Sequence, residues 1–208
     1  MTEKKKIIGV VVKLETIQIS QSQPRRYFNE AKMEQLTKSI ERHGILEPLI
    51  VRPLDSNRYE LIAGERRYRA AEAAGLTEVP VTIHDLDDQQ SKEVALLENL
   101  QREDLNPIDE TEGMLALLSQ ALNLSSQEII QLMNRVANAK RRNQPLTDNV
   151  TRQIETIDEL FLTVGRTTRE SFRTNRLPLM NLPSDMLEIL REGRLEYTKI
   201  KAITVLYN

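Results

Sequence analysis

The sequence predicts an α+β protein, in which a small mixed α/β domain at the N-terminus is followed by an all-helical domain. Over the first ~85 residues, short β-branched segments alternate with helical patterns, which is typical of a single mixed domain. After that point apolar residues recur at helical spacing, and capping residues mark where segments begin. We therefore expect the two domains to span 1–105 and 106–208.

Residue patterns predict the elements of the first domain in order. Alternating or β-branched composition predicts strands, which are Ile7–Leu14, Leu49–Val51, Tyr59–Ile62 and Val79–Ile83. Helices are expected over Glu30–His43 and Glu65–Ala74, and Gly44 and Gly75 follow them as C-terminal signals. A proline makes Gln23–Phe28 an extended segment.

Capping residues define the helices of the second domain. Asn106, followed by a proline and acidic residues, marks a helix start, and Ser125 or Ser126 caps the next helix. Gly165 ends a helix, and Thr167 or Thr168 caps the one that follows, up to Pro178. The other expected helices are Gln89–Arg102, Ile154–Leu162, Ser184–Arg191 and Thr198–Tyr207. The polar, basic segment Asn138–Asn149 contains a proline and is expected to be a loop or an irregular insertion.

Composition excludes several kinds of chemistry. The absence of cysteine excludes disulfides, thiol catalysis and a zinc ribbon, and two histidines do not support an imidazole-based metal site or triad. No apolar run approaches the ~20 residues of a membrane span, so we expect a cytoplasmic protein with no membrane partner. The net charge of −2 gives no global sign of nucleic-acid binding.

Basic residues are nevertheless concentrated in the second domain, which favours focal binding of a polyanion there. They are Arg135, Lys140, Arg141, Arg142, Arg152, Arg166, Arg169, Arg173 and Arg176. Spacings of four and three place Arg169, Arg173 and Arg176 on one face of a helix, with Thr174 and Asn175 among them. A helix-turn-helix within Ser125–Pro178 explains this pattern, and a solvated basic face is the alternative.

Gly64–Ala71 indicates an anion site. Arg66 and Arg67 occupy the first turn of the expected helix, where cations face the positive end of the helix dipole at a cost of a few tenths of a kcal/mol. An anion bound to the free N–H groups at that end would offset this cost. The segment is neither a P-loop nor a Rossmann fingerprint. The alternative is a surface helix whose arginines pair with Glu65 and Glu72.

Glu98 and Asn99 supply adjacent carboxylate and amide oxygens, which can hold Mg²⁺ when phosphates complete its ligands. The alternative is that Glu98 pairs with Arg102 at the i,i+4 spacing. Together with the arginines after Gly64, these residues are the parts of a nucleoside triphosphate site.

Three segments in order resemble the ParB family of chromosome- and plasmid-partitioning proteins. Gln23–Phe28 is similar to the family's first box, Gly64–Ala71 to its GERRxRAA box, and Glu98–Pro107 to its third box. The segments Leu177–Pro183 and Gly193–Leu195 resemble the region after the family's helix-turn-helix. The resemblance implies a ParB/sulfiredoxin-like N-terminal domain followed by a helix-turn-helix domain.

The resemblance also implies an activity. Such proteins bind CTP with Mg²⁺, load on double-stranded centromere DNA, close as a homodimeric sliding clamp and reopen after slow, DNA-stimulated CTP hydrolysis. A ParA-type ATPase is the implied partner, and the nucleoid or a plasmid the implied location. A transcription regulator with a non-hydrolysing nucleotide site remains an alternative. A small-molecule enzyme on the same fold is another, although without cysteine it would not be a sulfiredoxin.

Site residues follow from the matched motifs. The resemblance assigns the nucleotide pocket to Gln23, Arg25, Arg26, Gly64, Glu65, Arg66, Arg67, Arg69, Asn99 and Arg102. It assigns catalysis to Glu98 and Arg67, and the metal to Glu98 and Asn99. The basic clusters of the second domain, rather than the matched motifs, assign DNA binding to Arg166, Thr167, Thr168, Arg169, Arg173, Thr174, Asn175, Arg176, Lys140, Arg141 and Arg142.

The chain departs from the family's pattern in the second domain. An insertion around Asn138–Glu155 separates the expected helices, as in plasmid-borne, cyanobacterial-type members, and Ile154–Leu162 is then a candidate for the first helix of the pair. By the resemblance, the family's ATPase-stimulating tail is expected to be reduced to Thr2–Lys6. The C-terminal dimerisation domain is expected to be absent from these 208 residues.

Overall fold

The computed structural model describes residues 6–19, 30–55, 57–102 and 105–191, with the side chains of 6–8 left aside. It divides into two compact units, Met1–Ala95 and Leu96–Asn208, and each is described here by itself. The division falls inside a helix, ahead of the expected boundary at 105. Gln23, Arg25, Arg26 and the expected helix Thr198–Tyr207 lie outside the described residues.

A five-stranded mixed sheet forms the centre of the N-terminal unit, with the strand order β1-β5-β3-β4-β2. The strands are β1 (Lys6–Lys13), β2 (Ile17–Ile19), β3 (Leu49–Asp55), β4 (Arg58–Ala63) and β5 (Glu78–His84). The hairpin β3–β4 is antiparallel, whereas β3 pairs with β5 and β2 pairs with β4 in parallel. The sequence analysis did not predict β2, because three residues are too few to show a periodicity.

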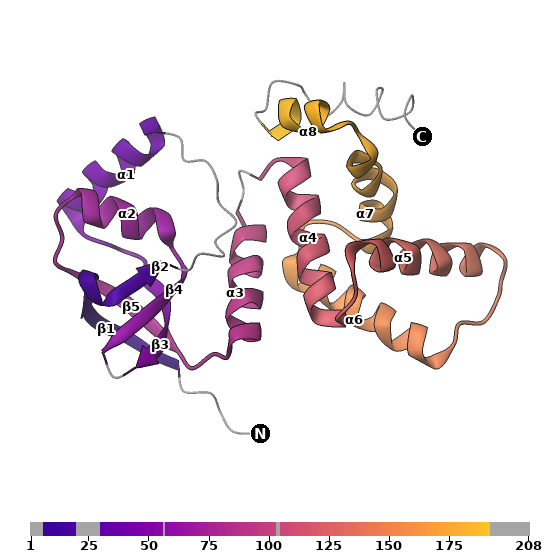
Figure 1. Cartoon of the computed structure of the whole chain (residues 1–208), viewed down its shortest axis with the longest axis horizontal. Coiled ribbons are helices and arrows are strands. Elements are labelled where there is room, and N and C mark those ends of the chain that lie inside the picture. The colour runs from indigo at the N-terminus through magenta and orange to yellow at the C-terminus, as the bar shows by residue number, and fades with distance from the viewer. Residues whose placement is uncertain (1–5, 20–29, 56, 103–104, 192–208) are drawn as a thin grey trace. The chain divides into compact units, whose positions relative to one another are not determined.

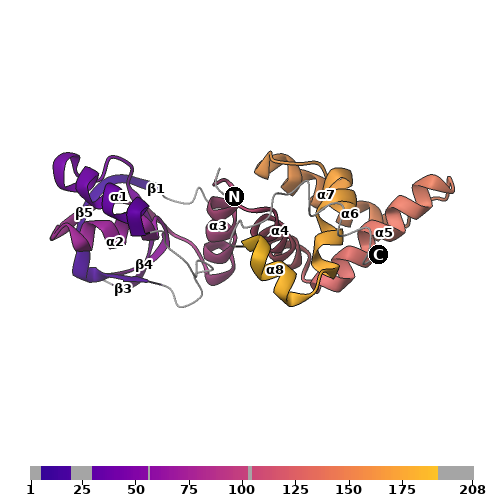
Figure 2. The ribbon, with the colours of Figure 1, turned by 90° about the horizontal axis from the view of Figure 1, so that it is seen from above.

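Two helices, α1 (Glu30–His43) and α2 (Glu65–Ala73), cover one face of this sheet (Figures 1 and 2). Beneath them lie Leu49, Val51 and Leu61, which are fully buried. Ala70 and Ala71 are also fully buried, and their small side chains allow α2 to approach the strands closely. The short η1 turn (Leu14–Thr16) connects β1 to β2.

The second unit is helical, and its helix boundaries depend on capping. Its elements are the end of α3 (Asp88–Leu100), α4 (Pro107–Leu122), α5 (Ser126–Arg141), α6 (Asp148–Val164), α7 (Arg169–Asn175), η2 (Leu177–Asn181) and α8 (Ser184–Arg191). The Asn106 side chain accepts hydrogen bonds from the N–H groups of Ile108 and Asp109, both at 2.9 Å. Ser125 and Glu128 form a reciprocal capping box at the start of α5. These caps confirm the predicted helix starts.

The prediction that Asn138–Asn149 is a loop or an irregular insertion is wrong at both ends of the segment, and a loop is present only in its middle. Helix α5 continues to Arg141, α6 already begins at Asp148, and only residues 142–147 connect them. Val136 and Ala139 are buried near the end of α5, and Val150 and Ile154 are buried at the start of α6. These apolar residues continue both helices, while polar and basic residues lie on the exposed side. The segment Asn138–Glu155 is therefore two helix ends and a turn.

The core of the helical unit draws on all of its longer helices and includes Phe172 of α7, which is fully buried. Its ring lies 5.2 Å from that of Phe161 on α6, at an interplanar angle of 58°. The end of α3 joins the same core through Leu100, which is fully buried. A side chain at Gly113 of α4 would meet Leu100 Cδ2 at 3.1 Å, so this glycine permits the close approach. None of the described helices is long and apolar enough to span a bilayer.

Candidate nucleotide and DNA sites

Helix α2 begins without a side-chain cap. Gly64, its N-cap residue, is in the left-handed region at φ 98° and ψ 25°, where a glycine is favoured. A Cβ at this position would lie only 2.9 Å from Leu49 Cδ2. The first-turn N–H groups of the helix have no capping side chain, so they are available to an anion.

The three arginines of α2 have different surroundings. Arg67 donates from Nη1 to the carbonyl oxygens of Glu47 at 2.5 Å and Pro48 at 2.8 Å, so it holds the turn before β3. Arg69 pairs with Glu65 at 2.6 Å. Arg66 is half-buried and makes no hydrogen bond or ion pair with another residue that the structure describes. The alternative of a paired surface helix therefore fits Arg69 but not Arg66.

Glu65 is buried, although its helix position is the first of α2. Its side chain is 8% exposed, and only Oε1 is engaged, by Arg69 Nε at 2.8 Å. The other oxygen, Oε2, is buried and has no hydrogen-bond partner among the described residues. Among the described residues, the start of α2 therefore presents N–H groups without a side-chain cap, one cation without a partner and one incompletely satisfied carboxylate.

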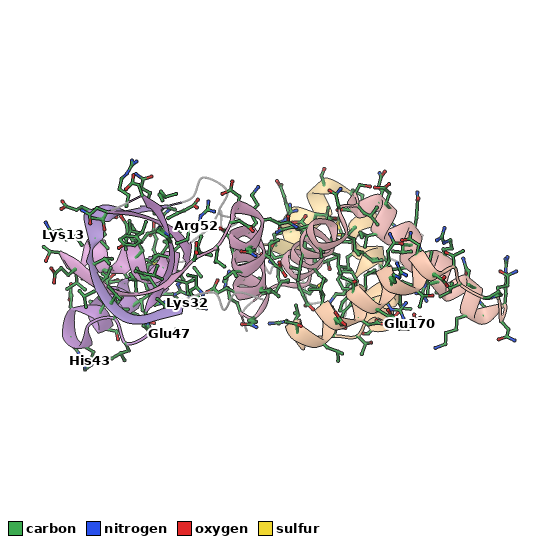
Figure 3. All side chains as sticks on the ribbon, turned by 90° about the horizontal axis from the view of Figure 1, so that it is seen from below. Lys13, Lys32, His43, Glu47, Arg52 and Glu170 are labelled. Carbon is green, nitrogen blue, oxygen red and sulfur yellow. The ribbon has the colours of Figure 1, made fainter. Side chains whose placement is uncertain are left out.

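Arg52 on β3 is a positioning residue that the sequence analysis missed (Figure 3). Its guanidinium lies 2.6 Å from Glu60 of β4 and 2.6 Å from Asp88, the first residue of α3. Burial opposes the charge of Arg52, yet the hydrogen bonds that it donates to the carboxylates of Asp88 and Glu60 raise its pKa. An arginine inside an otherwise apolar strand was the available signal. Arg52 ties the sheet to the start of α3.

The other half of the expected nucleotide site lies at the end of α3, in the helical unit. Glu98 and Asn99 are half-buried. Arg102 donates to Asn99 Oδ1 at 3.1 Å, while the Glu98 carboxylate makes no hydrogen bond or ion pair with a described residue. The alternative pairing of Glu98 with Arg102 is therefore not formed. The described residues contain no cluster of three or more ligating side chains, so a metal here would take its remaining ligands from substrate and water.

Helices α6 and α7 have the form of a helix-turn-helix. Gly165 ends α6 in the left-handed conformation at φ 71°, and Thr168 Oγ1 accepts a hydrogen bond from the N–H of Ser171 at 3.2 Å. The contact between Phe161 and Phe172 packs the two helices together. Helix α6 contains the expected Ile154–Leu162 segment and directly precedes α7. Helix α5 contacts α7 as well, through Asn134 and Arg173, so which of α5 and α6 is the first helix of the pair stays a prediction.

The basic side chains of this motif are engaged by neighbours rather than bare. Arg169 pairs with Asp158 of α6 at 2.8 Å, and Arg176 pairs with Glu110 of α4 at 3.2 Å. Arg166 in the turn donates to the carbonyl oxygens of Leu100 and Arg102, at the end of α3. The sequence pattern placed these residues on a common basic surface, but each of the three bonds to a different element.

Arg173 differs in degree, because its acidic partner is the most exposed of the three that pair with Arg169, Arg173 and Arg176. It pairs with Glu170 of the same helix at 2.6 Å, and the Glu170 side chain is 68% exposed. Figure 3 shows the Glu170 side chain, which is labelled there. The hydrogen bond from Arg173 lowers the pKa of Glu170. An exposed pair of this kind contributes about 0–1 kcal/mol, so a phosphate could displace Glu170 easily.

We expect Arg173→Ala to weaken DNA binding and to reduce the slope of log Kd against log salt by about 1, because one phosphate contact is lost. Glu170→Gln should strengthen binding, because it removes the competing carboxylate. Fluorescence anisotropy with a duplex, at 50 to 200 mM salt, measures both effects. The control is Glu128→Gln, an acidic residue of α5 that caps its own helix. An unchanged slope in Arg173→Ala would show that α7 does not lie at the phosphates.

Lys140, Arg141 and Arg142 lie at the exposed end of α5. Arg141 donates to Asn138 Oδ1 at 2.5 Å. Cations at a helix C-terminus are favoured by the helix dipole, so their position is also explained without DNA. Thr167 and Thr174 lie on the motif, where Thr174 Oγ1 donates to the Glu170 carbonyl at 2.9 Å.

Comparison with known proteins identifies the family. Residues 1–100 match the model of the ParB N-terminal domain. A probable plasmid-partitioning protein ParB of Thermus thermophilus is 48% identical over 178 residues, which cover 85% of this chain and 58% of that protein. The C-terminally truncated chromosome-partitioning protein ParB of Caulobacter crescentus, complexed with CTP-gamma-S, is 30% identical, and the match covers 95% of this chain and 92% of that one (TM-score 0.43). The chain belongs to the ParB family.

Structural comparison agrees with this assignment. The same Caulobacter crescentus ParB, complexed to the centromeric parS site, has a TM-score of 0.60 at 29% identity, over 94% of this chain and 84% of that one. The α+β fold with a ParB-type N-terminal unit and a helical second unit is therefore confirmed. This ParB-family chain spans 58% and 59% of the length of two curated relatives that it matches.

Proposed function

We propose that this chain is the nucleotide- and DNA-binding part of a partition protein. It binds CTP with Mg²⁺, loads at a centromere-like site on double-stranded DNA, closes as a homodimeric clamp and hydrolyses CTP slowly. The observation that carries the proposal is the start of α2 after Gly64, which has no side-chain cap and whose first turn contains Arg66, an arginine that no described residue pairs with. The CTP-gamma-S and parS complexes of the Caulobacter crescentus relative support the choice of ligands.

On the nucleotide side, each residue has a distinct task. The first-turn N–H groups after Gly64 hold phosphate oxygens, and Arg66 neutralises their charge. Arg67 acts through the backbone of Glu47 and Pro48, whose turn it fixes. Arg69 keeps Glu65 in place. Gln23, Arg25 and Arg26 are proposed to line the same pocket, but they lie outside the described residues.

The residues at the end of α3 fit a magnesium ion. Glu98 offers an uncommitted carboxylate, and Asn99 Oδ1 is oriented by Arg102 at 3.1 Å and keeps a second lone pair. When bound, Mg²⁺ would neutralise negative charge on the phosphates. Glu98 and Asn99 would supply the oxygen ligands, and Arg102 keeps the Asn99 side chain in its orientation.

DNA is proposed to bind at the helix-turn-helix, with Arg173, Thr174 and the basic end of α5 as its contacts. A ParA-type ATPase is proposed to contact Lys4, Lys5 and Lys6, whose side chains the structure does not describe. We place the protein in the cytoplasm, on the nucleoid or a plasmid.

Nucleotide hydrolysis tests the proposal. We expect weak hydrolysis that is selective for CTP among the four nucleotides and stimulated by a duplex that the chain has selected from a random library. Arg67→Ala should reduce it roughly 10²-fold, because the phosphate site loses its support. The control is Arg58→Ala, an exposed arginine of the same unit that pairs with Asp55. Equal use of ATP, or indifference to the selected DNA, would overturn the clamp proposal.

A second substitution tests the metal site. Glu98→Gln should leave CTP affinity within a few-fold, because an amide oxygen, Asn99 and the phosphates still hold the ion, but hydrolysis should fall by roughly 10²-fold. Calorimetric CTP titration and phosphate release measure the two effects. Unchanged hydrolysis would remove Glu98 from the site.

A further inference from the structure

An open groove lies between the end of α5 and the start of α6. Its volume is about 690 Å³, and helix residues and the connecting turn line it. Figure 1 shows α5 running out to this turn and α6 returning from it. The groove exists because the segment 138–155 folds as two helix ends rather than as an irregular insertion.

The lining is cationic and rich in hydrogen-bond donors. It includes Arg135 and Arg142, which make no side-chain hydrogen bond or ion pair with any residue within the described ranges. Amide side chains stand beside them, at Gln131, Asn138 and Gln144. None of the described residues that line the groove is acidic. Such a lining suits an anion that is too large to be held by one arginine alone.

The groove is continuous with the helix-turn-helix. Asn134, another lining residue, accepts from Arg173 Nη1 of α7 at 3.5 Å. Arg135 of α5 and Arg142, the C-cap residue of α5, therefore lie on the same surface as Arg173 of α7. A polyanion that reaches Arg173 extends directly towards the groove.

We infer that this groove binds the sugar-phosphate backbone of DNA that flanks the site contacted by α7. The inference rests on the proposed DNA-binding function and adds a contact to it. Arg135 and Arg142 each neutralise a phosphate, and the amides donate to phosphate oxygens. The contact carries no base preference, so it lengthens the footprint without changing the recognised sequence.

A salt titration tests the phosphate contacts. The probe is a duplex of about 40 base pairs and mixed sequence, bound by the full 208-residue chain. The variant Arg135→Ala/Arg142→Ala should bind the duplex more weakly than the wild type at 50 mM salt. Because two phosphate contacts are gone, the drop in its affinity between 50 and 200 mM salt should be about tenfold smaller than that of the wild type. The control Arg58→Ala/Arg152→Ala removes the same charge from exposed positions outside the groove. Equal slopes in the two variants would overturn the groove contact.

Crosslinking locates the contact. The chain has no cysteine, so Asn138→Cys creates a unique site in the groove for a photo-crosslinker. It should crosslink to the duplex, whereas Leu162→Cys, at an 80% exposed position of α6, should not. Crosslinking from both positions, or from neither while binding persists, would overturn the inference. If poly-glutamate competes as well as DNA does, the groove is an acidic-peptide site instead. A wild-type chain that binds no duplex would overturn the proposed function itself.

Discussion

Replacing Phe172 with alanine is expected to destabilise the helical unit by about 3–5 kcal/mol, the range for truncating a fully buried aromatic side chain. Phe172 is fully buried, and its ring packs against Phe161 at 5.2 Å. The substitution removes the contact that joins α6 to α7 and leaves a cavity that other side chains fill only in part. DNA binding should be lost with it, because α7 no longer has a fixed position.

Chemical unfolding followed by circular dichroism measures this effect. The expected control is Leu162→Ala, which shortens a side chain that is 80% exposed on the same pair of helices and should change stability by less than about 0.5 kcal/mol. The N-terminal unit has its own core, so its unfolding and its nucleotide affinity should change little. A loss below about 1 kcal/mol in Phe172→Ala would contradict this packing.

Arg176→Ala is expected to destabilise the helical unit by about 3 kcal/mol, since it leaves a buried carboxylate without its ionic partner. Arg176 lies 3.2 Å from Glu110, whose side chain is only 8% exposed. Glu110 lies in the first turn of α4, near the fully buried Ile108 and Thr111. If Arg176 served only to bind DNA, its replacement would weaken DNA binding without changing the stability of the unit.

A more exposed ion pair that also involves α4 provides a matched control. Arg191 of α8 pairs with Glu112 of α4, and the two side chains are 40% and 42% exposed. Arg191→Ala should therefore change stability by less than about 1 kcal/mol. Glu110→Gln combined with Arg176→Gln should recover part of the loss, because neither partner then carries a buried charge. Equal stabilities of Arg176→Ala and the wild type would return Arg176 to the DNA surface.

Local signals predicted much of the fold. Asn106, Ser125 and Thr168 mark helix starts, and Gly165 marks a helix end, because capping depends on residues within one turn of each other. The strand β2 escaped prediction because its pairing with β4 is a long-range contact. The end of α5 escaped it because polar residues and a nearby proline outweighed the buried Val136 and Ala139.

Candidate site residues were also recognisable from their types and spacing, but their partners were not. Arg66 and Arg67 are adjacent and identical in type, yet only Arg67 reaches the carbonyl oxygens of Glu47 and Pro48. In the same way, Arg169 and Arg173 of α7 and its C-cap residue Arg176 pair with α6, with α7 itself and with α4, respectively. The direction of a long side chain depends on which acid or carbonyl the folded chain brings near it.

The sequence by itself therefore determined the order of the elements, the two-part α+β architecture and the motifs that place the chain in the ParB family. These depend on local propensity, capping and motif spacing. Only the tertiary structure decided which arginines are already engaged by the protein, which carboxylates have no partner among the described residues and where the groove beside Arg135 and Arg142 opens. Those features arise from contacts between residues far apart in the chain, and no local pattern encodes them.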